Sequence, residues 1–162
     1  MSMDWGQSTK IVTPFTKPGH ALMTIFEANS SHREAILAID PIAENDPDRV
    51  AFIDQALQSH VVLIAVINKA LVGYGVLEYT FYGQGFISML YVNESYRRQG
   101  TGTALMEALI ERCSTQKLFT STNESNAPMH ALLQTLGFSR SGVIHNLDPG
   151  DPEWVYFKNL AT

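Results

Sequence analysis

A short segment rich in arginine and glycine has the clearest chemical potential in this chain. Residues 97–102, RRQGTG, follow an apolar stretch at 86–92 and precede a helical pattern that runs to about residue 114. Glycines between a strand and a helix leave backbone N–H groups unpaired, and the helix dipole adds partial positive charge behind them. Two arginines supply further donors that suit phosphate oxygens. The segment therefore predicts a phosphate-binding loop.

The elements around this loop predict a mixed sheet. Apolar stretches at 61–67, 71–81 and 86–92 are separated by short turns, which is typical of an antiparallel meander. A full helix separates 86–92 from the next apolar stretch, so we expect those two strands to be parallel. The expected strands are 22–28, 61–67, 71–81, 86–92, 118–122, 141–145 and 154–160, and the helices are 32–39, one that opens at Asp46 or Asp48, 102–114 and 126–136. The predicted class is α/β (α+β), with about seven strands in the order β-α-α-β-β-β-α-β-α-β-β.

Two local features add detail to these elements. Ser30 or Ser31 can cap the first helix, and Glu34 would complete a capping box with Ser31. Gly73 and Gly75 inside the strand at 71–81 indicate a bulge or a close neighbour.

Composition limits the classes of function. The 162 residues, 45% hydrophobic and 17% charged, predict a single globular domain at 21–162 behind a partly ordered extension at 1–20. A net charge of −5 argues against nucleic acid as the main partner and favours a cationic substrate. The longest apolar run, 61–67, is too short to span a membrane. One cysteine and no export signal predict a cytoplasmic protein without a disulfide.

Two motifs resemble the GCN5-related N-acetyltransferase superfamily. Arg97-x-x-Gly100-x-Gly102 matches the family signature (Gln/Arg)-x-x-Gly-x-(Gly/Ala), whose loop binds the pyrophosphate of coenzyme A. Asn126 precedes Gly137-Phe138 by eleven residues, as in the family pattern Asn-x-x-Ala-x-x-x-Tyr-x-x-x-Gly-Phe. The resemblance covers about residues 21–162. It implies acetyl-CoA as co-substrate and transfer of acetyl to a primary amine of a small molecule or peptide.

The resemblance also implies which residues hold the cofactor. In the family, the strand before the loop pairs with the pantetheine arm and supplies an oxyanion donor. The expected cofactor-binding residues are Leu90, Tyr91, Val92, Arg97, Arg98, Gln99, Gly100, Thr101, Gly102, Thr103, Asn123 and Asn126. Asn123 can instead be a turn or cap residue. The histidines show no metal-binding spacing and the single cysteine has no pair, so no metal is expected.

The catalytic groups are marked less clearly. Leu133 stands where many family members carry a tyrosine that protonates the departing thiolate, which leucine cannot do. Glu78 would become a better proton acceptor if partly buried in the sheet, but it can also face solvent. His130 lies on roughly the same helix face as Leu133 and can accept or donate a proton, or it can be a packing residue. Both are candidates for the base.

Leu133 also leaves a second function open. Because a fold does not fix an activity, a non-catalytic acetyl-CoA sensor or interaction module is the alternative to an enzyme. The oligomeric state is open as well, and a homodimer is possible.

Overall fold

The structure is a computed structural model, and it describes residues 11–15 and 21–161. These residues form two compact units. The first comprises the described residues up to Leu77 together with Met89–Glu111, and the second comprises Glu78–Ser88 and residues 112–161. Strands β4 (Ala70–Phe81) and β5 (Gln84–Val92) each run from one unit into the other.

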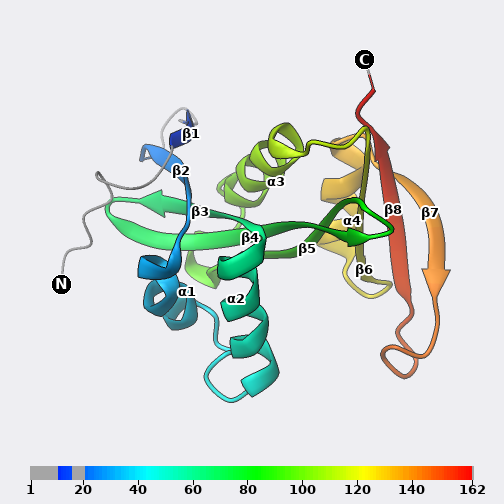
Figure 1. Ribbon diagram of the computed structural model, residues 1–162, viewed down its shortest axis with the longest axis horizontal. Coiled ribbons are helices and arrows are strands. Elements are labelled where there is room, and N and C mark those ends of the chain that lie inside the picture. The colour runs from blue at the N-terminus through cyan, green and yellow to red at the C-terminus, as the bar shows by residue number, and fades with distance from the viewer. Residues whose placement is uncertain (1–10, 16–20, 162) are drawn as a thin grey trace. The chain divides into compact units, whose positions relative to one another are not determined.

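The first unit contains an antiparallel arrangement of four strands in the order β1-β2-β3-β4 (Figure 1). Its β1 (Ile11–Phe15), β2 (Met23–Glu27) and β3 (Val61–Ile67) precede β4 along the chain. Asn68 and Lys69 join β3 to β4 with φ values of 50° and 65°, the left-handed geometry that closes a tight hairpin. Strand β1 lies within the predicted extension 1–20, whose other residues are outside the described residues.

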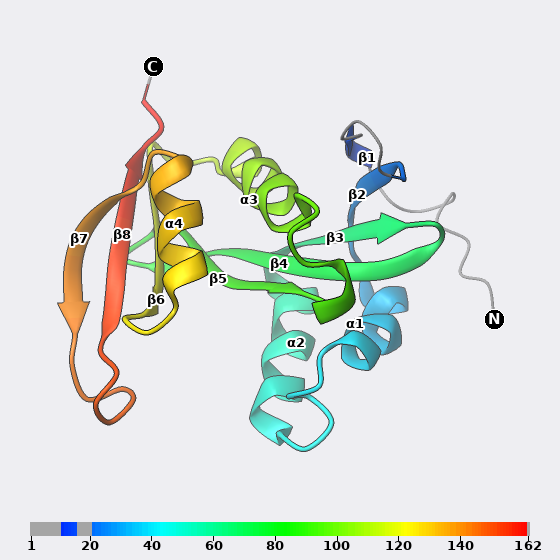
Figure 2. The same ribbon diagram turned by 180° about the vertical axis from the view of Figure 1, so that it is seen from behind.

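Helices cover both faces of the first unit's strands. The helices α1 (Arg33–Ile39) and α2 (Pro47–Ser59) lie on one side, and α3 (Thr101–Arg112) lies on the other (Figures 1 and 2). Core residues on the α1 and α2 side include Ile36 and Ile53, which pack with Tyr74 and Val76 of β4. This arrangement leaves the start of α3 on the opposite side from α1 and α2.

Two glycines of β4 have close neighbours, at positions where the sequence predicted a bulge or a close neighbour. A Cβ atom added to Gly75 would lie 2.7 Å from Leu109 Cδ1, and one added to Gly73 would lie 2.9 Å from the carbonyl oxygen of Tyr91. Both contacts are too short for a real side chain. The prediction of a close neighbour is therefore confirmed, and it explains how α3 approaches the strands.

The expected cap of the first helix is wrong. A 3-10 turn at Ser30–His32 precedes α1, and its N-cap is Asn29, whose Oδ1 accepts the N–H of Ser31 at 2.9 Å. The Asn29 N–H donates to His32 Nδ1 at 3.0 Å, so these two residues form the capping box. Glu34 instead accepts from Arg33 at 2.7 Å. Asparagine one position earlier competes successfully with serine for the cap.

The second unit combines a parallel and an antiparallel pairing. Residues 85–87 of β5 pair in parallel with Leu118–Thr120 of β6 (Lys117–Asn123), as expected. The antiparallel strand β8 (Glu153–Asn159) lies between β6 and β7 (Ser139–Ile144), visible in Figure 1. Helix α4 (Ala127–Thr135) has Leu136 as its C-cap, and the φ of 84° at the following Gly137 allows the N–H of Phe138 to reach the carbonyl of Leu133 at 2.9 Å.

The predicted order of helices and strands is confirmed, with β1 as an additional strand in front. The predicted boundaries of the regular elements differ from the observed ones by only a few residues. No helix in residues 11–15 and 21–161 is long and apolar enough to cross a membrane.

Candidate functional site

The loop between β5 and α3 contains two residues with left-handed backbone. A 3-10 turn at Glu94–Tyr96 ends the strand, and the side chain of Asn93 caps it by accepting the N–H of Ser95 at 3.0 Å. Arg98 then has φ 63° and Gly100 has φ 86°. Glycine adopts such values freely, whereas any other residue at position 100 would be strained. Helix α3 begins immediately afterwards at Thr101.

This geometry leaves a row of donors without acceptors. The first loop-to-helix bond runs from the N–H of Ala104 to the carbonyl of Gly100, at 3.0 Å. Within the described part of the chain, none of the N–H groups of residues 98–103 donates to a protein acceptor. They lie at the positive end of the α3 dipole, where anions are stabilised. The arrangement fits a phosphate or diphosphate group.

Arg97 attaches the loop to its strand. Its Nε donates to the carbonyl oxygen of Val92 at 3.0 Å, and its guanidinium carbon lies 5.8 Å from the centre of the Tyr91 ring. The second arginine, Arg98, has an exposed side chain. Leu90–Val92 and the loop at 97–103 thus lie together in the first unit.

Two hydroxyl groups near these segments are buried without a partner. Among the described residues, Ser88 Oγ and Thr101 Oγ1 are the buried side-chain oxygen or nitrogen atoms that lack a hydrogen bond. Thr101 is 1% exposed, so its hydroxyl is closed off from solvent. Ser88 follows the residues of β5 that pair with β6, and sequence reasoning gave it no role.

In the second unit, Asn126 and Asn123 have separate roles. Asn126 is the N-cap of α4, and its Oδ1 accepts the N–H of Met129 at 3.3 Å. The Nδ2 of Asn123 donates to Asp148 Oδ2 at 2.8 Å and to the carbonyl of Asp151 at 3.3 Å. Asn123 is the last residue of β6, and its side chain therefore ties the end of this strand to the loop before β8.

His130 uses both ring nitrogens within the second unit. Its Nδ1 lies 2.5 Å from the hydroxyl of Tyr156, and its Nε2 lies 3.0 Å and 3.1 Å from the carbonyl oxygens of Asn123 and Glu124. Carbonyl oxygens only accept, so we assign the ring proton to Nε2 and the accepting lone pair to Nδ1. Tyr156 is fully buried and was missed, because it is far from His130 in sequence.

Glu78 is the remaining candidate from the sequence. It is partly buried on β4 and accepts a hydrogen bond from the hydroxyl of Thr80, two residues along the same strand. Glu78, Asn123, Asn126 and His130 belong to the second unit, whereas the loop belongs to the first.

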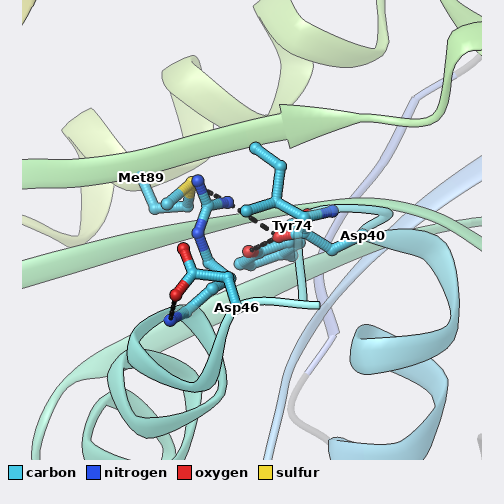
Figure 3. A network of polar contacts seen from close by, with 6 residues as sticks. Asp40, Asp46, Tyr74 and Met89 are labelled. Atoms are coloured by element: carbon cyan, nitrogen blue, oxygen red, sulfur yellow. Dashed lines mark hydrogen bonds and ion pairs between the residues drawn. The ribbon is translucent and has the colours of Figure 1, made fainter. Parts of the chain in front are cut away.

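A buried polar cluster, which we call the Asp40 network, lies on the α1 and α2 side of the first unit (Figure 3). It consists of Asp40, Arg49, Tyr74 and Met89. Asp40 Oδ2 accepts from the hydroxyl of Tyr74 at 2.6 Å and from Arg49 Nη1 at 2.8 Å, and its Oδ1 accepts the N–H of Ile42 at 3.1 Å. Arg49 Nη1 also lies 3.7 Å from Met89 Sδ. The cluster thereby joins α2 and the loop after α1 to strands β4 and β5.

Burial and charge shift the ionisation of this network. Burial raises the pKa of Tyr74 well above its usual range, and the neighbouring Asp40 carboxylate adds to the effect. Burial alone would lower the pKa of Arg49, but the Tyr74 hydroxyl and Asp40 together hold it above its ordinary value. Tyr74 is therefore neutral and Arg49 cationic at physiological pH. Sequence reasoning missed these residues, since Asp40 and Tyr74 are 34 positions apart.

Comparison with known proteins decides the family. Residues 22–138, more than half of the chain, match the model of the acetyltransferase (GNAT) family. The chain belongs to this family. A search of curated proteins found no match. The GNAT fold explains the order of elements and the loop before α3, so the predicted family and fold class are confirmed.

Solved GNAT structures agree with this assignment. A GNAT acetyltransferase from Bacillus cereus has 28% identity and a TM-score of 0.79, covering 86% of this chain and 99% of its own. The ribosomal-protein-S18-alanine N-acetyltransferase from Escherichia coli has 20% identity and a TM-score of 0.76, covering 86% and 95%. A GNAT acetyltransferase from Elizabethkingia anophelis with acetyl-CoA bound has 22% identity and a TM-score of 0.69, covering 85% and 98%.

Membership of the GNAT family establishes the enzyme class and the co-substrate. The protein is an acetyltransferase that uses acetyl-CoA, as the sequence motifs implied. In the described residues, no group of three or more histidine, cysteine, aspartate or glutamate side chains is placed to hold a metal ion.

Proposed function

We propose that the acetyl acceptor is a primary amine of a small molecule or peptide, and that residues 97–103, the cofactor loop, bind the pyrophosphate of acetyl-CoA. One observation carries the assignment of the loop. The N–H groups of residues 98–103 have no acceptor among the residues that the structure describes, and they lie at the start of α3. A diphosphate supplies the acceptor oxygens that these donors lack. Leu90–Val92, in the same unit, would take the pantetheine arm.

The proposed reaction is direct transfer. The amine nitrogen attacks the thioester carbonyl carbon, the new C–N bond forms, the C–S bond breaks, and coenzyme A leaves as the thiolate. Backbone N–H groups of Leu90–Val92 would stabilise negative charge on the carbonyl oxygen. Leu133 is buried and has no proton to give. A thiol with a pKa of about 8.5 is a fair leaving group without a protein acid, and water can return the proton.

Glu78 and His130 are the proposed candidates for the base that takes the ammonium proton. Both nitrogens of His130 already have hydrogen-bond partners, which supports a role in holding the end of β6 in place. Glu78→Gln and His130→Ala separate the two. The base is the residue whose replacement removes the acidic limb of the pH–rate profile, and an unaltered profile excludes the residue concerned.

The experiment that tests the proposal follows free thiol during incubation with acetyl-CoA and a panel of primary amines. The panel includes amino acids, polyamines and peptides with N-terminal alanine, since a structural neighbour acts on a ribosomal-protein alanine. We expect thiol release that depends on at least one amine, with mass spectrometry showing the acetylated product. Acetyl-CoA binding without release on any amine would contradict the proposal and favour a sensor.

A further inference from the structure

The Asp40 network lies on the acceptor side of the proposed site. The cofactor loop leads into α3, which packs on the face of β4 that contains Gly73 and Gly75. Tyr74 and Met89 belong to the opposite face, beneath α1 and α2. Helix α3 and the cofactor loop occupy the first face, and α1 and α2 cover the strands of the second face. An acceptor on this second side would therefore bind at the partly exposed Arg49 and not on the strands themselves, a placement that rests on the proposed function.

Arg49 presents unused donors on this face. Its Nη1 is engaged by Asp40 Oδ2 and Met89 Sδ, but within residues 11–15 and 21–161 its Nε and Nη2 have no hydrogen-bond partner. Neither nitrogen is among the buried unpaired atoms of the described residues, so both reach solvent. The side chain as a whole is only 19% exposed. Nε and Nη2 form one edge of the guanidinium, and that edge matches the two oxygens of a carboxylate.

The support behind Arg49 holds this edge in place. Asp40 is 1% exposed, and its carboxylate also accepts from the Tyr74 hydroxyl and the Ile42 N–H, so its charge is shared among three donors. A buried ion pair contributes little more stability than an apolar pair of the same volume. The pair instead fixes a cationic side chain in one orientation, which apolar residues could not do.

The position of Arg49 relates it to the reaction. Met89, which its guanidinium contacts, immediately precedes the segment Leu90–Val92 proposed to hold the acetyl end of the co-substrate. A group bound to Arg49 would therefore lie close to the thioester. In an amino acid, the amine and the carboxylate are separated by only a few bonds. A carboxylate bound to Arg49 would therefore leave the amine of the same molecule near the thioester.

We infer that Arg49 binds the carboxylate of the acceptor, and that the acceptor is a small amine carrying a carboxylate, as an amino acid does. The loop before α2 suits the other charge of such a molecule. Glu44 and Asp48 are exposed acidic residues there, and they attract an ammonium group. Asp46 is occupied as the N-cap of α2, accepting the N–H groups of Asp48 and Arg49. A zwitterion carries both a carboxylate that suits Arg49 and an ammonium group that suits these acidic residues.

The test compares amino acids with their carboxamides in the full-length protein. The wild type should have a kcat/KM at least about 10-fold higher for the acid than for the amide, the discrimination expected of a charge-assisted bidentate contact. In Arg49→Met, most of this preference in kcat/KM for the acid over the amide should be lost. Arg33→Met is the matched control, because Arg33 pairs with Asp54 of α2 and should leave the ratio unchanged.

A ratio of rates within one variant is insensitive to partial loss of folded protein. If Arg49→Met does not fold, Arg49→Lys keeps the charge beside Asp40, loses the planar fork, and should lower the ratio by several-fold. The same acid-to-amide ratio in the wild type and the Arg49 variant would overturn the inference while leaving the proposed function intact. Faster acetylation of amides or peptides by the wild type would also overturn it. Acetylation of no amine at all would overturn the proposed function and this inference together.

Discussion

The cofactor loop and the Asp40 network belong to the same unit but are built in opposite ways. The loop presents backbone N–H groups from consecutive residues, 98–103, and its arginine Arg97 is bound to its own strand. The network consists of side chains from α2, β4, β5 and the start of the loop that follows α1. The N–H groups of the loop are available to a ligand, whereas most donors of the Asp40 network bind acceptors within the network.

This contrast separates two kinds of effect. Because the loop's donors are unpaired in the protein, changing the loop should alter ligand binding with little change in folding stability. Because Asp40 is buried and shared by three donors, changing it should alter stability with little change in cofactor affinity. Arg49 is the member of the network that has unused donors among the described residues. Changing it should therefore affect both folding stability and ligand binding.

The largest effect is expected from Gly100→Glu. A side chain at φ 86° strains the loop, and the added carboxylate repels the pyrophosphate. We expect the Kd for acetyl-CoA to rise by about 100-fold or more, measured by calorimetry. Gly83→Glu is the matched control, since Gly83 also has positive φ, 73°, and no atom within 4 Å of an added Cβ. Equal affinity in the two variants would contradict the assignment of the loop.

Asp40→Asn should give the largest loss of stability. The substitution keeps the shape but leaves the Arg49 charge without its buried counter-ion. Removing one partner of a buried pair costs about 3–5 kcal/mol, so urea unfolding should show a loss in that range. An unchanged midpoint would mean that the network does not stabilise the core. The acetyl-CoA affinity of the folded fraction should stay near that of the wild type.

Tyr74→Phe removes a single hydrogen bond from the same carboxylate. Asp40 keeps Arg49 and the Ile42 N–H, so we expect a smaller loss of about 1.5 kcal/mol in the free energy of unfolding. The same urea titration measures it. A loss as large as that of Asp40→Asn would show that the tyrosine, rather than the ion pair, holds the network together.

His32 should add a pH-dependent contribution at the start of α1. Burial lowers the pKa of His32 in the folded protein, so the unfolded chain binds the proton more readily. Stability is then fully present above the unfolded pKa of about 6.5 and falls as the pH drops through the lower folded value. His32→Asn retains an acceptor for the Asn29 N–H without titrating. The variant should lose less stability between pH 7 and pH 5 than the wild type.

The smallest effect is expected from Asp54→Asn. Arg33 and Asp54 form a close pair between α1 and α2, at 2.5 Å, but both side chains are well exposed, at 37% and 40%. Arg33 lowers the pKa of Asp54, yet solvent screens the attraction. We expect no measurable change in the unfolding midpoint at physiological salt. A loss like that of Asp40→Asn would show that ion pairing itself, and not burial, explains the network.

The same contrast explains what could be predicted from the sequence. The loop could be proposed from the sequence because phosphate binding of this kind depends on consecutive residues, and the φ of 86° at Gly100 is a value that favours glycine. The strands and helices were found because apolar periodicity is local. The Asp40 network escaped prediction because it depends on tertiary contacts, and nothing in the sequence distinguishes Asp40 from other polar residues near a helix end.

Two further cases show the same limit. The first helix was assigned the wrong cap, since Ser31 and Glu34 fit the sequence pattern of a capping box better than Asn29 and His32, which form the observed one. His130 was singled out by its face on α4, but its partner Tyr156 lies on β8 and is fully buried. Residue type and spacing identified the candidates; the partners that define their roles came only from the fold.

The most direct test of the central claim is amide hydrogen exchange at residues 98–103 with and without acetyl-CoA. These N–H groups have no protein acceptor, so they should exchange rapidly in the free protein. Saturation with acetyl-CoA should slow their exchange markedly, because the pyrophosphate oxygens become their acceptors. Gly100→Glu should show no such protection at the same cofactor concentration. Binding of acetyl-CoA to the wild type with unchanged exchange at residues 98–103 would contradict the account.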